Sequence, residues 1–325
     1  MDIDLQVLRL LEREKEIPFD ELVLIIEAAI LAAFHKHVGE QPKGARAELD
    51  RKTGHVRVFQ ALLNEEEEPV GEEDVTPEGF GRVAAYAAKQ VIAQRMREIS
   101  DEGLLGEFKG KEGDIVSGQI QQGSRSNMVY INLGSIEALM PPEEQVPGEP
   151  YLHGSRIRVY VTSVQKGPRG PQITVSRTHP GLVRKLFALE VPEVQSGQVE
   201  IASVAREAGH RTKIAVIAKE PGINAKGACI GELGQRVRAV SAELNEEKID
   251  VVDFSEDLAT FVAHALSPAR VSDSFVLDAA TKAVRVLVPD FQLSLAIGKE
   301  GQNARLAAKL TGAKIDIQPD SILEG

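Results

Sequence analysis

The feature of this sequence that most constrains its fold is an internal repeat toward the C-terminus. The stretch CIGELGQRVR at 229–238 aligns without a gap on AIGKEGQNAR at 296–305, and the tripeptide Lys-Ile-Asp follows at 248–250 and again at 314–316. In each copy an apolar, strand-like stretch precedes the glycines, KIAVIA in the first and AVRVLV in the second. Because a duplicated unit imposes the same architecture twice, we expect two copies of one small α/β module.

Both copies contain a G-x-x-G tetrapeptide that opens a helix. Glycine lets the backbone approach a ligand closely, and the N–H groups of the helix start point toward it, which is the geometry that binds phosphate. The pattern is that of the GXXG loop of a KH module, which clamps the backbone of about four nucleotides. One such tetrapeptide indicates only a turn or a helix cap, and a duplicated structural unit without a ligand is the alternative. Two tetrapeptides in aligned contexts favour RNA binding.

The candidate RNA contacts of the repeat are its glycines and the polar residues that follow them. In the second copy these are Gly298, Lys299, Gly301, Gln302, Asn303 and Arg305. In the first copy they are Gly231, Gly234, Gln235, Arg236 and Arg238. The first loop has Glu232 and Leu233 between its glycines, where the second has Lys299. Because a carboxylate repels phosphate, we expect the second loop to bind the RNA backbone more strongly.

Helix signals disappear between residues 110 and 177, and five short β-rich runs alternate with Gly and Pro. The runs are DIVSGQI, MVYINL, IEALM, RIRVYVTSV and QITVSR. Five short strands predict a small closed barrel of the OB type, which binds single-stranded nucleic acid or oligosaccharide. We expect Tyr130 to stack on a base and nearby cations to contact phosphates, namely Arg125, Arg156, Arg158, Lys166 and Arg169. The alternatives are a half-buried strand aromatic for Tyr130 and solvated surface for the cations.

The first 108 residues show a different pattern, typical of an α+β unit. Helical periodicity over 1–38 with a break at Pro18 predicts two helices, and residues 45–62 predict two strands. The acidic segment 64–79 is expected to be a loop kept from compact packing by self-repulsion. A helix is predicted from 76 to 97.

Charge is distributed unevenly along the chain, whose formal net charge is −11. Residues 1–108 hold 13 Lys and Arg against 23 Asp and Glu, whereas residues 109–325 hold 25 against 26. Nucleic acid is therefore expected to meet the near-neutral remainder, where local basic clusters outweigh the average. The acidic unit is expected to meet a basic protein surface, with a role in solubility as the alternative.

Composition and motifs exclude several classes of protein. No 18-residue run is free of charge, and the N-terminus lacks the pattern of a signal peptide, so we expect a cytoplasmic protein without a membrane contact. The single cysteine, Cys229, rules out intrachain disulfides and cysteine-rich zinc sites, and is expected to be a small buried hydrophobe. The seven histidines lack ligand spacing, and no P-loop or nucleophile-elbow motif occurs. We expect no metal, no cofactor, no catalytic residue and no enzyme activity.

The order of these modules resembles the NusA family of bacterial transcription elongation and termination factors. Four long strings carry the resemblance: residues 80–98, residues 174–194, KGACIG at 226–231 and LAIGKEGQNARLAAKLTG at 295–312. The resemblance covers essentially all of the sequence. It implies a multidomain α+β protein with an α+β N-terminal domain, an OB-fold (S1) β-barrel and two tandem prokaryotic-type (type II) KH domains. The expected domain boundaries are 1–108, 109–178, 179–255 and 256–325.

The same resemblance implies a function. The N-terminal domain is expected to bind the RNA polymerase core at the β-flap region near the RNA exit channel. The S1 and KH domains are expected to bind nascent single-stranded RNA, so that the protein modulates pausing, intrinsic termination and, with other Nus factors, antitermination. We expect a monomer. Because the given sequence ends soon after the second repeat, we expect no contact through the acidic C-terminal repeats that some members carry.

Two departures from the family pattern and one connecting helix refine these expectations. Glu232 and Leu233 replace the usual basic residue of the first KH loop. S1 modules often carry two aromatics in the second strand, where this chain has Tyr130 and Asn127, so we expect less stacking. A helix over 179–190 is expected to connect the barrel rigidly to the first KH module.

Two other classes of protein use the same RNA-binding modules. A ribosome-associated protein or RNA chaperone would carry S1 and KH modules but would have no use for the acidic unit. An RNA-degrading enzyme would need a catalytic core, for which 108 residues without a metal or phosphate constellation are too few. An assay for phosphate-dependent decay of RNA distinguishes an RNA-degrading enzyme from a protein that only binds RNA.

Overall fold

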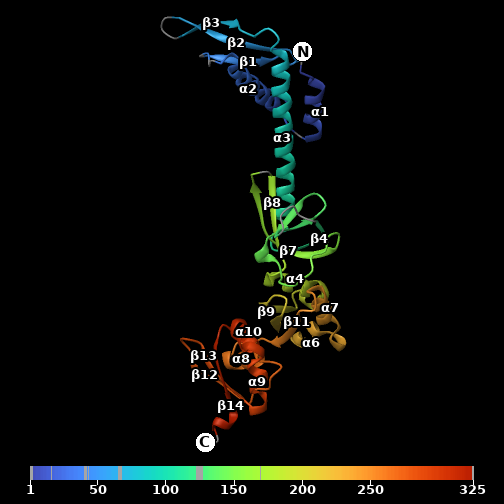
Figure 1. Cartoon of the computed structure of the whole chain (residues 1–325), viewed down its shortest axis with the longest axis vertical. Coiled ribbons are helices and arrows are strands. Elements are labelled where there is room, and N and C mark those ends of the chain that lie inside the picture. Colours follow the sequence, from blue (N-terminus) through green and yellow to red (C-terminus); the bar gives the residue numbers. More distant parts are fainter. Residues whose placement is uncertain are drawn as a thin grey trace. The chain divides into compact units, whose positions relative to one another are not determined.

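The structure is a computed structural model that describes residues 3–15, 17–39, 42, 44–64, 68–121, 127–168 and 170–323. It divides into two compact units, Met1–Leu104 and Leu105–Gly325 (Figure 1). Each unit has hydrophobic clusters of its own, and the two are described one after the other.

The described part of the first unit pairs helices with a three-stranded antiparallel sheet of order β1-β2-β3. Its elements are α1 (Leu5–Lys15), α2 (Phe19–Val38), β1 (Ala45–Leu49), β2 (Val56–Leu63), β3 (Pro69–Asp74) and α3 (Gly81–Lys109), the last of which continues past the unit boundary. Helix α2 places Ile26, Ile30 and Phe34 on one buried face, which packs against Leu49 and Val58 of the sheet. The predicted pair of N-terminal helices and the first two strands are confirmed.

The acidic segment after β2 is not a loop throughout, so that prediction is wrong for Pro69–Asp74, which pairs with β2. Arg46 of β1 donates two hydrogen bonds to the carboxylate of Glu72, at 2.9 and 2.8 Å. Its guanidinium carbon also lies 4.8 Å from the ring centroid of Phe59. These hydrogen bonds from Arg46 lower the pKa of Glu72. A cation placed among the carboxylates offsets the repulsion that was expected to prevent pairing.

The predicted helix of the first unit begins later than its periodicity indicated, at Gly81 instead of Thr76. The Thr76 hydroxyl oxygen accepts a hydrogen bond from the backbone N–H of Val58 at 2.8 Å, so this residue still belongs to the edge of the sheet. Gly79, with φ of +77°, then turns the chain before the helix starts.

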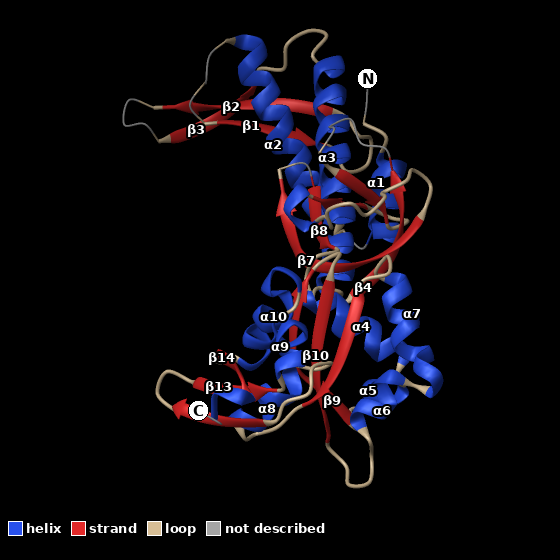
Figure 2. Ribbon diagram, turned by 60° about the horizontal axis from the view of Figure 1, so that its bottom comes forward, coloured by secondary structure: helices blue, strands red, loops and turns tan. Residues whose placement is uncertain are grey.

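The second unit opens with the predicted barrel. Its strands are β4 (Ile115–Gln121), β5 (Val129–Asn132), β6 (Glu137–Met140), β7 (Arg156–Gly167) and β8 (Gly170–Ser176). They close in the order β4-β5-β6-β8-β7, with β6 and β8 parallel. Figure 2 labels β4, β7 and β8 of this barrel. Ile131, Val159 and Ile173 are fully buried inside. The closed barrel of OB type is confirmed.

The second repeat folds in the order α-β-β-α-α-β, and the first has the same order with one additional four-residue helix after its first helix, which confirms two KH domains of the prokaryotic type. The first contains α4 (Pro180–Glu190), α5 (Pro192–Gln195), β9 (Val199–Glu207), β10 (Arg211–Ala218), α6 (Ala225–Ile230), α7 (Gln235–Glu243) and β11 (Lys248–Asp253). The second contains α8 (Leu258–Ala265), β12 (Asp273–Asp278), β13 (Ala283–Val288), α9 (Leu293–Ile297), α10 (Gln302–Thr311) and β14 (Lys314–Pro319). In both sheets the last strand runs parallel to the central one.

The repeated Lys-Ile-Asp tripeptide has a structural cause. Its aspartate lies directly opposite a basic residue of the central strand, so that Asp250 faces Lys213 and Asp316 faces Arg285. Both pairs are ion pairs of 2.8 Å. The repeat therefore preserves one cross-strand charge pair per sheet.

Packing joins the barrel and both KH domains into one unit. His179 caps α4 by accepting the backbone N–H of Gly181 at 2.9 Å, and its ring stacks on Tyr160 of the barrel with centroids 4.4 Å apart. The predicted helix between the barrel and the first KH domain is thus confirmed. On the other side, Ala215 and Val252 of the first KH sheet share a hydrophobic cluster with α8, α10 and the second sheet.

Candidate nucleic-acid interface

The two GXXG loops have the same backbone conformation. Gly231 and Gly298 both have φ near +75° with extended ψ, at 75°/172° and 78°/169°. The third loop residue is left-handed in each copy, Leu233 with φ of 50° and Glu300 with φ of 53°. An added Cβ on Gly298 would lie 2.8 Å from the backbone nitrogen of Asn303. Only glycine fits this first position, both for its dihedral angles and for the approach of the next helix.

The fifth residue after the first glycine supports the loop in both copies. Arg236 donates a hydrogen bond to the carbonyl oxygen of Ala228 at 2.8 Å, and the Asn303 side-chain amide donates to that of Ala296 at 2.9 Å. Arg236 also forms an ion pair with Glu193 at 2.9 Å, and Asn303 is only 1% exposed. The prediction that the Asn303 side chain contacts RNA is therefore wrong. This side chain is buried, and its amide donates a hydrogen bond to the end of the preceding helix.

Three predicted contacts are exposed at the loops without a side-chain partner among the described residues. Lys299 lies within the second loop, and Gln235 and Arg238 lie at the start of α7 after the first. Leu233, at the tip of the first loop, is 88% exposed. The second loop therefore presents a cation without a side-chain partner among the described residues, and the first presents an apolar tip.

Gln302 and Arg305 are both bound by one carboxylate of the first KH domain. Glu207, the last residue of β9, accepts from Arg305 Nε at 2.6 Å and from Gln302 Nε2 at 3.0 Å. The hydrogen bond from Arg305 is the main cause that lowers the pKa of Glu207 to about 2, against a smaller opposing effect of burial.

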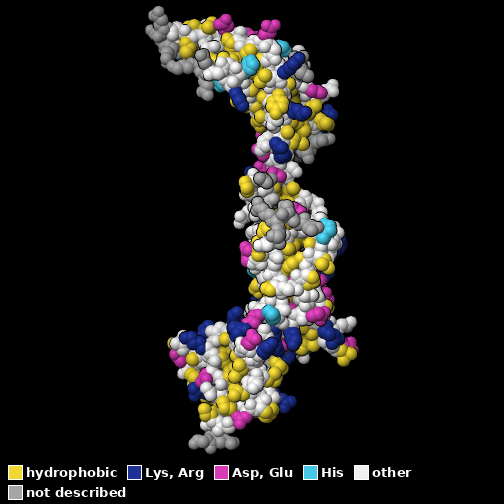
Figure 3. Space-filling view, viewed as in Figure 1, with side chains coloured by type: hydrophobic (Ala, Val, Ile, Leu, Met, Phe, Trp, Pro, Cys, Tyr) yellow, Lys and Arg dark blue, Asp and Glu magenta, His cyan; other side chains and the backbone are white. Residues whose placement is uncertain are grey.

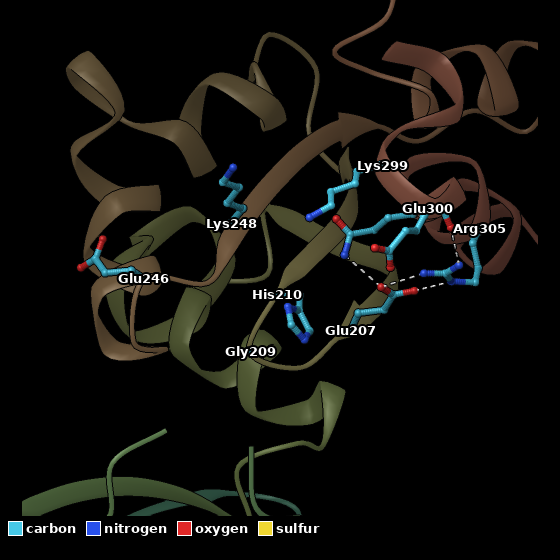
Figure 4. Close-up of a pocket in the computed structure, with 9 residues that line it drawn as sticks. Glu207, Gly209, His210, Glu246, Lys248, Lys299, Glu300 and Arg305 are labelled. Atoms are coloured by element: carbon cyan, nitrogen blue, oxygen red, sulfur yellow. Dashed lines mark hydrogen bonds and ion pairs between the residues drawn. The ribbon is translucent and has the colours of Figure 1, made fainter. Parts of the chain in front are cut away.

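A pocket of about 570 Å³ lies between the two KH domains (Figure 4). It is lined by Glu207, Gly209, His210, Glu246, Lys248, Lys299, Glu300, Gln302 and Arg305. Figure 3 shows Lys and Arg side chains gathered over the region where these domains meet, with acidic side chains among them. Lys248 and Lys299 reach the pocket from different domains, so the predicted phosphate-binding loop opens onto a surface shared by both repeats.

The barrel residues do not form a single cluster. Tyr130 is half-buried on β5, and Arg158 of β7 forms an ion pair of 2.8 Å with Glu243 of α7. Arg156 lines a neighbouring pocket of about 270 Å³, whereas Lys166 lies at the opposite end of β7. Asn127 precedes β5 and so does not lie in the strand beside Tyr130. Two further predicted contacts lie outside the described residues, Arg125 and Arg169.

The described residues contain neither a membrane-spanning helix nor a cluster of metal ligands. None of the helices within the described ranges combines the length and apolar character needed to cross a bilayer. Over the same ranges, no group of three or more His, Cys, Asp or Glu side chains is arranged to hold a metal ion.

Three segments of this chain match domain models of one protein family. Residues 5–71 match the NusA N-terminal domain, 177–254 the NusA-like first KH domain, and 258–324 the NusA-like second KH domain. The transcription termination/antitermination protein NusA of Mycobacterium tuberculosis is 54% identical over 99% of this chain and 94% of its own length. This chain belongs to the NusA family.

One further protein and one solved structure are similar to this chain. The protein of the same name from Bacillus subtilis is 47% identical to this chain over 98% of it and 91% of the relative. A solution structure of the N-terminal domain of NusA from the same species is 33% identical and covers 29% of this chain and 93% of its own, with a TM-score of 0.25. The resemblance drawn from the repeat and the order of the modules is confirmed.

Sequence reasoning missed six of the nine residues that line the inter-domain pocket in this NusA-family chain, among them Glu207, His210 and Lys248 of the first KH domain. Glu207 and His210 flank a β-turn that carries no motif, and nothing in their neighbourhood signals a site. Lys248 did carry a signal, because it opens the repeated tripeptide, but that match served only to align the two copies. All three come close to the second loop only through the packing of one KH domain on the other.

Proposed function

We propose that this chain is a transcription factor that binds RNA polymerase through its N-terminal domain and nascent single-stranded RNA through its S1 and KH domains. It modulates pausing, intrinsic termination and antitermination in the bacterial cytoplasm, as a monomer and without enzyme activity. The proposed domains are residues 1–108, 109–178, 179–255 and 256–325. The observation that carries the proposal is the pair of GXXG loops with one backbone conformation in domains that share a hydrophobic cluster.

The proposed RNA contacts are those that remain accessible. Lys299 and Arg238 provide cations at the two loops, and the backbone N–H groups that follow Gly298 and Gly231 provide donors for phosphate. Tyr130 and the exposed Arg156 extend this surface onto the barrel. Because residues 109–325 are nearly neutral overall, each contact is weak and binding depends on their number.

The N-terminal domain is proposed as the tether that brings these weak contacts to their RNA. Residues 5–71 match the NusA N-terminal domain, and the first 108 residues carry most of the net negative charge of the chain. An acidic surface suits a basic partner, and we propose the β-flap region of the polymerase core near the RNA exit channel. Holding the chain there raises the effective concentration of emerging RNA at each module. Other Nus factors join the complex during antitermination.

Co-elution with the cognate RNA polymerase core tests the tether. We expect the full chain and residues 1–108 to co-elute with the core, and residues 109–325 not to do so. Co-elution of 109–325 alone, or failure of the full chain, would contradict the assignment of the tether. Incubation of the full chain with RNA and phosphate is expected to leave the RNA intact, and decay would favour an RNA-degrading enzyme.

The RNA interface is tested on the full chain by titration with a short single-stranded RNA at several salt concentrations. Lys299→Ala removes one proposed phosphate contact, so we expect roughly fivefold weaker binding and a salt slope reduced by about one. The matched control is Lys52→Ala, which removes an exposed lysine from a turn of the acidic domain and is expected to change neither quantity. Equal behaviour of the two variants would remove Lys299 from the interface.

A further inference from the structure

The ion pair between Glu207 and Arg305 links a strand of the first KH domain to the helix that follows the second GXXG loop. We propose that Glu207 is a positioning residue that holds this loop in place against the first KH domain, and that Arg305 acts through Glu207 instead of contacting phosphate. This inference rests on the proposed function of RNA binding. It assigns to the first domain a part in shaping the RNA site of the second.

We call the contacts of Arg305 with Glu207 and with the second loop the brace, because they connect the first KH domain to that loop. Arg305 donates to both oxygens of Glu207, from Nε at 2.6 Å and from Nη2 at 3.2 Å, which is a side-on bidentate contact. Its third nitrogen, Nη1, donates to the carbonyl oxygen of Glu300 at 3.1 Å. Glu300 is the third residue of the loop itself and has a left-handed conformation. One guanidinium therefore connects the first domain to the backbone of the second loop (Figure 4).

A second contact makes the same connection. Gln302, the first residue of α10, donates from Nε2 to Glu207 at 3.0 Å. Gln302 and Arg305 are the two predicted RNA contacts of α10 that are not buried. Both donate hydrogen bonds to the carboxylate of Glu207. A phosphate that bound the Nε–Nη2 edge of Arg305 would have to displace Glu207, whereas Lys299 has no side-chain partner among the described residues. Lys299 is therefore the cation within the second loop that no described carboxylate pairs with.

The first repeat provides the comparison. Arg238 occupies the position equivalent to Arg305 and is exposed without an ion-pair partner among the described residues. The first loop is held instead from within its own domain, by Arg236 and its ion pair with Glu193. The brace from a neighbouring domain is therefore specific to the second loop and is not a requirement of the GXXG conformation.

The exposed fractions of the two side chains indicate whether this ion pair affects the stability of the protein or the position of the loop. The side chains of Glu207 and Arg305 are 18% and 48% exposed. A partly solvated ion pair contributes little to overall stability, so variants that lack it are expected to stay folded. The effect of the pair is expected in the position of the loop, and hence in RNA affinity.

RNA titrations of the full chain at several salt concentrations separate a brace from a phosphate contact. For Glu207→Ala we expect roughly fivefold weaker binding with an unchanged salt slope, because a positioning group is lost and no phosphate contact is removed. Arg305→Ala is expected to match it, and the double variant to be no weaker than either. The charge swap Glu207→Arg with Arg305→Glu is expected to recover binding.

Two matched controls accompany these variants. Arg238→Ala removes the equivalent but unpaired arginine, so its salt slope is expected to fall by about one. Asp316→Ala removes the carboxylate from an ion pair on the second KH sheet and is expected to bind RNA as the parent does. Tighter binding by Glu207→Ala with a steeper salt slope would overturn the proposal, since it would show Arg305 released to contact phosphate. Unchanged binding would overturn it as well.

A measurement without RNA separates failure of this proposal from failure of the proposed function. Amide hydrogen exchange of the full chain reports the local opening of the second loop. We expect faster exchange at residues 299–303 in Glu207→Ala but not in Asp316→Ala. If the parent protein binds no RNA, the proposed function fails and this exchange decides the brace by itself. Equal exchange in both variants would overturn the brace even where RNA binding is intact.

Discussion

At the scale of single residues, Cys229 shows how burial controls chemistry. Its side chain is fully buried next to the first GXXG loop, and burial, with the carboxylate of Glu193 adding to it, raises the pKa of the thiol to about 11. The thiolate is the reactive form, and at pH 8 it makes up about a quarter of a free thiol with a pKa near 8.5. The raised pKa leaves on the order of 0.1% thiolate at Cys229.

We therefore expect an aromatic disulfide reagent to react at least about 100-fold more slowly with the native protein at pH 8 than with the urea-unfolded chain. The rate in the native protein should rise as the pH approaches 11, because the thiol loses its proton only there. Absorbance of the released thiolate measures both rates, and Cys229→Ala gives the blank. Equally fast labelling of native and unfolded protein would contradict this account.

At the scale of elements, the two glycines of a GXXG loop have different requirements. Gly298 has φ of +78° with extended ψ, and an added Cβ would meet the backbone of α10. Gly301 has φ of +72° and ψ of 12°, a left-handed conformation with nothing within 4 Å of an added Cβ. The first glycine therefore needs both its dihedral angles and its lack of a side chain, whereas the second needs only its angles.

We expect Gly301→Ala to lower the free energy of unfolding by about 1 kcal/mol, the cost of a left-handed alanine. Gly298→Ala is expected to cost roughly 3 kcal/mol or more, because strain and a backbone clash act together. Urea unfolding of the full chain, followed by far-ultraviolet circular dichroism, measures both. Equal losses would show that the loop shifts to accommodate the methyl group at Gly298.

At the scale of the whole molecule, a buried arginine joins the barrel to the first KH domain within the second unit. Arg177 is 2% exposed and forms a buried ion pair with Glu149 of the barrel. It also donates to the carbonyl oxygens of Arg158 in the barrel, at 2.9 Å, and of Glu243 at the end of α7, at 2.8 Å. Removing the guanidinium would leave a buried carboxylate and two partly buried hydrogen-bond acceptors without these donors.

We expect Arg177→Met to lower the free energy of unfolding by about 3 kcal/mol and to separate unfolding of the barrel from that of the first KH domain. Calorimetry of the full chain should then show an additional transition. Arg156→Met, at an exposed arginine of β7 that lines the same pocket as Arg177 and has no ion-pair partner among the described residues, is expected to stay within about 0.5 kcal/mol of the parent. A single unshifted transition in Arg177→Met would contradict the role of this contact.

The sequence by itself determined the features that depend on local backbone geometry. The repeated glycines required the same conformation of positive φ at Gly231 and Gly298, and alternating strand patterns with turn residues indicated the barrel. The order of the modules followed from these local signals. Family membership followed from the long strings that surround them.

Only the tertiary structure decided which side chains remain free to bind. Asn303 is buried and Arg305 is paired with Glu207, although both occupy helix positions that look accessible in the sequence. The acidic strand β3 likewise forms because Arg46 of another strand offsets its charge. Dihedral preferences act on neighbouring residues and leave a mark in the local sequence. Burial and ion pairing join residues far apart in the chain, and packing alone brings those partners together.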